Sequence, residues 1–204
     1  MLQRPSSRPS KNNILTFLSQ LLSVCLFLVS SLISCSASPV PDALQVLLSM
    51  IQATPNVAAG DVYLFPGSGE NHGMALAEAL EIRVRIASEE LLRAAFSPEY
   101  SVSEQTENHH ILQDISDSGA CRFSTAASPQ EYVVIRCISR ADTHEAARLL
   151  LHRLNALQKQ YRGTDHQALT ERGQVIIIGK YVCLVVSPDP DAAIEAARRV
   201  ITKS

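Results

Sequence analysis

The chain of 204 residues contains no tryptophan, and only 5% of its residues are aromatic. Sugar-binding surfaces commonly stack their ligand on exposed aromatic rings, so a platform of that kind is poorly supported. The five cysteines include no CxxC pair, and none is spaced with histidine as structural zinc ligands are. These absences argue against a sugar-stacking lectin and against a zinc-stabilised domain.

Positive charge is also scarce, because 18 basic residues face 20 acidic ones. No basic stripe runs through the chain, and proteins that bind nucleic acid need clustered lysine and arginine. We therefore predict no nucleic-acid partner.

Enzyme signatures are missing in the same way. No serine stands in a G-x-S-x-G elbow. The glycine-containing segment 67–73 lacks the Gly-Lys-Ser/Thr of a phosphate-binding loop, and its third glycine comes one position too late for a dinucleotide fingerprint. We interpret it as a flexible turn.

Two sets of titratable residues are candidate sites. His109 and His110 with Asp114 and Asp117 could ligate a metal on a helix, but adjacent histidines diverge, so a solvated loop is favoured. The pair 89–90 is better explained by the dipole at the start of a helix. We predict no catalytic, cofactor-binding or metal-binding residues, and a protein that is not an enzyme.

What the chain does have is a signal at its N-terminus. Residues 1–13 carry three basic residues and no acid, and 14 of the 20 residues from Ile14 to Ile33 are apolar. Leu32-Ile33-Ser34-Cys35 follows, and it resembles the lipobox of bacterial lipoproteins. The resemblance implies cleavage before Cys35 and attachment of diacylglycerol to its sulfur.

Two alternatives stay open at this point. The apolar run is long enough to span a bilayer, although its serine, threonine and glutamine residues make it a polar span. An ordinary signal peptidase could also cut after Ala37.

The lipobox divides the chain into three parts: a signal peptide (1–34), an anchor cysteine with a linker (35–41), and a single globular domain (42–204). Removal of the signal leaves 15 basic and 20 acidic residues, a net charge of −5. We predict a bacterial membrane protein, lipid-anchored on the extracytoplasmic face. Its domain retains Cys121, Cys137 and Cys183, an odd number that allows at most one internal disulfide. We expect buried apolar thiols, with Cys121 and Cys137 as the first pair to test.

Hydrophobic periodicity predicts the elements of this domain. Asp42 caps a helix that ends near Ala53. Then come a strand (61–65), a helix to Leu80, a strand (81–87), a helix after Ser88 and a loop-dominated connection (97–119).

The sequence pattern predicts the elements of the C-terminal half more clearly. This half contains a hairpin (120–125 and 131–139), a helix (143–161) with Asp142 and Glu145 as a capping pair, a second hairpin (174–178 and 181–186) and a helix from Pro190. Gly179 fits a two-residue type II′ turn. The order β-β-α-β-β-α predicts an α+β fold, an antiparallel sheet with helices on one face.

This half resembles a family of small Gram-positive bacterial lipoproteins that carry a domain of unknown function. The resemblance covers residues 131–202 and rests on 131–135, on Arg148, Leu149, Leu157 and Tyr161, on the hairpin 179–187 and on 188–193. This chain departs from the family around its central helix, where it has Arg, His and Gln instead of Lys and acidic residues. The family has no assigned activity, so the resemblance implies a fold and a cellular location but no site residues.

We therefore expect a binding or envelope-associated module, with the membrane as its partner through the lipid anchor. An extracytoplasmic enzyme that uses segments 66–73 and 109–117 is one alternative. The other is a subunit of an envelope assembly, which would dock another envelope protein through an exposed sheet face around Tyr132 and Ile138.

Overall fold

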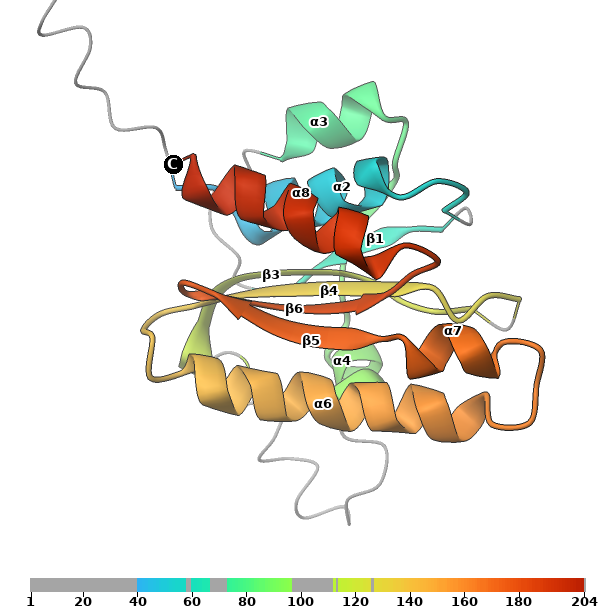
Figure 1. Cartoon of the computed structure of the whole chain (residues 1–204). Coiled ribbons are helices and arrows are strands. Elements are labelled where there is room, and N and C mark those ends of the chain that lie inside the picture. The colour runs from blue at the N-terminus through green and yellow to red at the C-terminus, as the bar shows by residue number, and fades with distance from the viewer. Residues whose placement is uncertain are drawn as a thin grey trace, which may run out of the picture. The chain divides into compact units, whose positions relative to one another are not determined.

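The globular part of the chain consists of three layers, with a β-sheet between two layers of helices (Figure 1). The computed structural model describes residues 40–57, 60–66, 73–96, 112, 114–125 and 127–203. The predicted signal peptide and lipobox lie outside these residues. Within them, no helix is long and apolar enough to cross a membrane.

Within the described residues the sheet has six strands, in the order β2-β1-β3-β4-β6-β5. β1 and β2 are parallel, whereas the other neighbouring strands pair antiparallel. The strands are β1 (Val62–Leu64), β2 (Val84–Ile86), β3 (Ser116–Arg122), β4 (Glu131–Cys137), β5 (Gln174–Ile178) and β6 (Tyr181–Val186).

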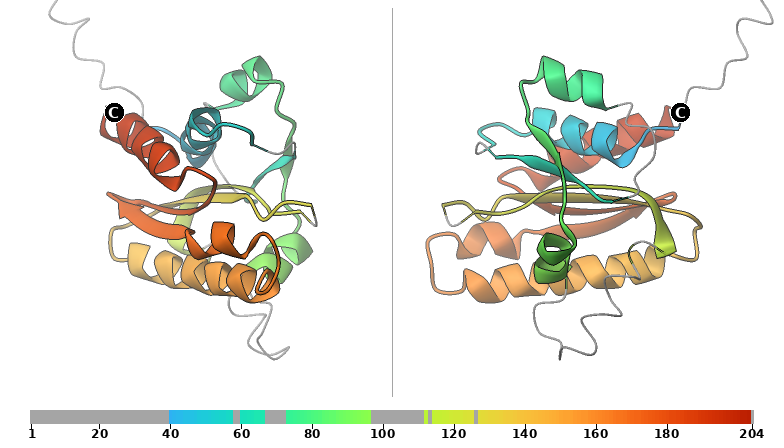
Figure 2. Two further views of the ribbon diagram at one scale, coloured as in Figure 1. Left: turned by 45° about the vertical axis from the view of Figure 1, so that its right-hand side comes forward. Right: turned by 180° about the vertical axis from the view of Figure 1, so that it is seen from behind.

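Helices cover both faces of this sheet (Figures 1 and 2). α2 and α8 lie on one face, with α3 outside α2, whereas α4 and α6 lie on the other. The helices are α2 (Ala43–Ala53), α3 (Met74–Ala79), α4 (Glu89–Phe96), α6 (Thr143–Gln160), α7 (Gln167–Glu171) and α8 (Pro190–Thr202).

The α+β class and the C-terminal order β3-β4-α6-β5-β6-α8 are confirmed, with the short α7 inserted before β5. The expectation that helices cover one face is wrong. Tyr132 and Val134 pack under α2 and α8, while Val133 and Ile135 pack on α6. Because β4 is apolar on both sides, each side needs a covering layer, as in sheets whose strands read as continuous apolar runs.

The start of the domain is fixed by its first helix. The Asp42 carboxylate accepts a hydrogen bond from the Gln45 amide at 2.7 Å, which confirms the predicted N-cap. The preceding carbonyl, that of Pro41, accepts hydrogen bonds from Arg136 on β4 and Tyr181 on β6. The residues before α2 are therefore tied to β4 and β6, two neighbouring strands inside the sheet.

The second hairpin also follows the sequence prediction. Gly179 has φ +62°, and β5 and β6 pair with Ile178 opposite Tyr181 and Ile176 opposite Cys183. Asp189 then caps α8 by accepting the Ala192 amide at 3.0 Å. The predicted turn, register and helix start are confirmed.

Two local predictions are wrong. β3 begins at Ser116, inside the expected loop, because its small residues allow close packing. The Ala43 amide donates a hydrogen bond to the Ser118 hydroxyl at 2.9 Å, and the ring of Phe65 lies against Gly119. Asp142 does not cap α6, since its carboxylate accepts the Ser139 amide instead.

Candidate functional site

The segments that the sequence offers as candidate sites lie largely outside the described residues. This holds for residues 67–72 and for His109 and His110. Asp114 is exposed, and Asp117 forms an ion pair with Arg136 at 2.6 Å. The described part of the chain contains no group of three His, Cys, Asp or Glu residues placed to hold a metal ion.

The three domain cysteines are buried free thiols. Cys121 lies opposite Val133, four residues along β4 from Cys137, a separation of about 13 Å at ~3.3 Å per residue. A disulfide needs Cα atoms within about 7 Å, so Cys121 and Cys137 do not pair. Cys183 belongs to the core on the opposite face of the sheet.

Burial also makes these thiols unreactive. Desolvation raises the pKa of Cys183 to about 12 and that of Cys137 to about 11, and burial raises the pKa of Cys121 well above its usual value. The thiolate, which is the reacting form, is therefore very sparse at neutral pH.

We expect the three thiols to resist alkylation by iodoacetamide at pH 8 in the folded protein and to react fully in denaturant. Peptide mass spectrometry measures each position separately from Cys25 and Cys35. Fast modification of Cys121, Cys137 or Cys183 under native conditions would contradict this inert role.

The clearest candidate for a ligand site is a cavity of about 520 Å³ beside β1, here called the Arg122 cavity. It lies where the end of α2, the start of β1 and the segment between α3 and β2 meet. Figure 2 shows the green chain that leaves α3 passing the edge of the sheet on its way to α4. The lining residues are Ile51, Val57, Gly60, Asp61, Val62, Leu80, Glu81, Ile82, Arg83 and Arg122.

Arg122 is the buried charge of this cavity. Its side chain projects from the end of β3 on the α2 side of the sheet, and the residue is only 3% exposed. Desolvation lowers the pKa of its guanidinium, and the nearby Tyr132 opposes that shift. Tyr132 lies directly opposite on β4, and its buried hydroxyl has no hydrogen-bond partner among the described residues.

The rim of the Arg122 cavity is more polar than its walls. Asp61 forms an ion pair with Arg85 at 2.8 Å and lies 3.9 Å from Arg83. Glu81 is exposed and has φ +55°. Asp61 is thus already matched by arginine and Glu81 is solvated, whereas Arg122 is buried.

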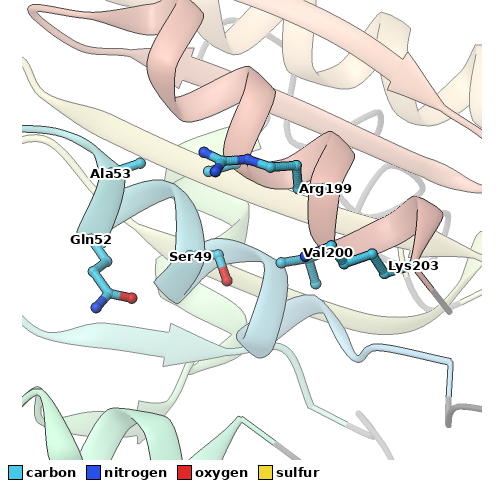
Figure 3. Close-up of a pocket in the computed structure, with 7 residues that line it drawn as sticks. Ser49, Gln52, Ala53, Arg199, Val200 and Lys203 are labelled. Atoms are coloured by element: carbon cyan, nitrogen blue, oxygen red, sulfur yellow. The ribbon is translucent and has the colours of Figure 1, made fainter.

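A second hollow lies between α2 and α8 and measures about 360 Å³ (Figure 3). Ser49, Gln52 and Ala53 line it from α2, Arg199 from α8, and Lys203 from the C-cap of α8. The Ser49 hydroxyl already donates to the Gln45 carbonyl at 2.8 Å, and both cations are exposed. Exposed charges bind anions weakly in water, so this hollow is the poorer candidate.

One other buried charge has a structural role. Glu131 is fully buried and accepts two hydrogen bonds from Arg153, at 2.7 and 2.8 Å, and one from the Ser124 amide at 3.0 Å. Burial alone would lower the pKa of Arg153, but the hydrogen bonds and charge of Glu131 raise it overall. The pair closes the β3–β4 hairpin onto α6.

Sequence analysis missed Arg122. The residue falls in a predicted strand, 120–125, where a charged side chain is normally assigned to solvent. The alternation along β3 places Ala120 in the core under α2, and Arg122, two residues on, lies on the same face. That signal was present, but it required knowing that α2 covers this face.

Comparisons with known proteins do not identify the chain, since no family model, no curated protein and no solved structure matches it.

Proposed function

We propose that this chain is a bacterial lipoprotein, anchored at the extracytoplasmic face of the cytoplasmic membrane through Cys35, and that its α+β domain is a non-enzymatic binding module. The observation that carries the proposal is Leu32-Ile33-Ser34-Cys35 at the end of an apolar run behind three basic residues. The resemblance to small Gram-positive lipoproteins supports the same location. Two or more acyl chains would provide a stable anchor.

The layout of the domain agrees with a short tether. Cys35 precedes Pro41 by six residues, and the Pro41 carbonyl is already bound to β4 and β6. A fully extended linker of that length spans about 20 Å, so the domain would stay close to the bilayer. The Arg122 cavity supports the binding role, because its volume falls in the range of small-molecule sites.

The docking face of the alternative assembly hypothesis is corrected. Tyr132 is fully buried beneath α2 and α8, and only Ile138, at 49% exposure, reaches the surface. An assembly subunit would have to use another surface, so the binding module is the function we favour.

The anchor is tested by producing the full chain in a Gram-positive host. We expect the mature N-terminal peptide to begin at Cys35 and to carry lipid mass, and we expect Cys35→Ser to abolish lipidation and leave the signal uncleaved. Cys25→Ser is the matched control, because Cys25 lies within the apolar run without a lipobox before it. A mature N-terminus at Ser38, or an intact Met1 in the wild type, would refute the anchor.

A further inference from the structure

The chain enters the domain at one end of the sheet, and three separate segments meet there. The Pro41 carbonyl accepts hydrogen bonds from Arg136 at the end of β4 and from Tyr181 at the start of β6. The turn from β5 to β6 lies at the same end, since Arg136 and Tyr181 pair in register. Figures 1 and 2 show that α8 also ends there, near the start of α2. We call this end of the domain the Pro41 end.

The surface of the Pro41 end combines apolar and basic side chains. Val40 is 60% exposed, and Ile138, in the connection from β4 to α6, is 49% exposed. Arg140 from the same connection, Lys180 from the β5–β6 turn and Lys203 at the C-cap of α8 are exposed cations. The Lys180 ammonium donates to the Ile138 carbonyl at 2.7 Å, so the basic and apolar groups adjoin. The sequence shows no basic run here, because the cations come from separate segments.

Acidic side chains also lie at the Pro41 end, but two of them are engaged locally. Asp117 forms an ion pair with Arg136 at 2.6 Å, and the Asp142 carboxylate accepts the Ser139 amide at 2.8 Å. Asp114 is exposed nearby. A hollow at the opposite end of the sheet is lined by three acids and one arginine, namely Glu171, Asp189, Asp191 and Arg172. An anionic surface would therefore attract the Pro41 end more than the opposite end.

We propose that the Pro41 end docks on a bilayer that contains anionic phospholipid. Arg140, Lys180 and Lys203 contact the headgroups, and Val40 and Ile138 lie at the boundary of the acyl region. The inference rests on the proposed lipid anchor, and it adds the orientation of the domain and the lipid charge that the domain recognises.

The anchor makes such weak contacts sufficient. A single exposed cation binds an anion weakly in water. The linker from Cys35 to Pro41, however, spans about 20 Å at most, so docking becomes an intramolecular step at high effective concentration. Each lysine or arginine close to an anionic leaflet then strengthens docking about fivefold. Burial of the exposed parts of Val40 and Ile138 acts in the same direction.

The chain has no tryptophan, so an introduced one reports on its own position. Ile138→Trp places the reporter on the Pro41 end. Leu151→Trp is the matched control, because Leu151 is 48% exposed on α6, away from this end. The full lipidated chain is reconstituted in vesicles of phosphatidylglycerol and brominated phosphatidylcholine in equal parts. We expect the emission of Ile138→Trp to be quenched and shifted to shorter wavelength, and that of Leu151→Trp to be neither.

Charge variants test the role of the cations in the Ile138→Trp background. Lys180→Gln with Lys203→Gln should lower the ratio of docked to undocked domain at least about tenfold, and vesicles of phosphatidylcholine alone should have a similar effect. Arg162→Gln with Arg172→Gln is the matched control, because it removes the same charge from exposed residues at the opposite end. This control should change the ratio by no more than about twofold.

Equal quenching of Ile138→Trp and Leu151→Trp would overturn the proposal, as would quenching that is unchanged without phosphatidylglycerol or in the double lysine variant. The mass of the N-terminal peptide, measured on the same preparations, separates this inference from the anchor. A lipidated Cys35 with equal quenching at both positions refutes docking alone. An unlipidated chain that keeps the difference between the two positions refutes the anchor alone.

Discussion

Replacing Glu131 with alanine is expected to lower the free energy of unfolding by about 3–5 kcal/mol, because it leaves the Arg153 guanidinium buried without its carboxylate. The exposed fraction of the side chain is 0% for Glu131 and 14% for Arg153, so water does not easily replace the lost partner. The Ser124 amide loses its acceptor as well. Urea denaturation of wild type and variant measures the difference.

Glu145→Gln is the control for this experiment. Glu145 pairs with Arg148 on the surface of α6, and both side chains are more than a third exposed, so we expect a loss below about 1 kcal/mol. The double variant Glu131→Ala with Arg153→Met should lose less unfolding free energy than the two single variants lose together, since no unpaired charge remains. Similar small losses for Glu131→Ala and Glu145→Gln would show that the buried pair is not critical.

The second large effect is expected at Gly119, in the middle of β3. A Cβ at this position would lie 2.1 Å from Cδ2 of Phe65, whose ring is buried and packs edge-on against Phe96 with centroids 5.9 Å apart. Gly119→Ala must displace that ring, and we expect a loss of about 1–3 kcal/mol, as for other overpacked cores. Thermal and urea unfolding of the variant measure the loss.

A compensating change tests this cause. Phe65→Leu reduces the side chain that covers Gly119, so Gly119→Ala should cost less in the Phe65→Leu background than in the wild type. An equal cost in both backgrounds would assign the loss to the backbone of β3 instead of the contact with Phe65.

Local signals predicted much of this fold. Asp42 and Pro190 mark helix starts through the chemistry of their own first turns, and Gly179 sets a hairpin register through a single backbone conformation. Such features depend on residues that are neighbours along the chain. They can therefore be predicted without knowledge of what packs against them.

The features that the sequence did not predict depend on contacts between residues far apart in the chain. The hairpin strand β4 reads as apolar on both faces, but only the placement of α2, α6 and α8 shows that both are covered. Glu131 and Arg153 are 22 residues apart, and each alone looks like an ordinary surface charge. Arg122 is a candidate binding residue only because segments near Gly60 and Ile82 enclose it.

The attachment of Pro41 has a mechanical consequence. Its carbonyl is held from β4 by Arg136 and from β6 by Tyr181, two neighbouring strands inside the sheet. A pulling force on the chain before Pro41 would act on these strands before it could detach α2 from the sheet. Resistance to pulling should then depend on the pairing of β4 with β6, and the load would reach these strands through the Arg136 guanidinium and the Tyr181 hydroxyl.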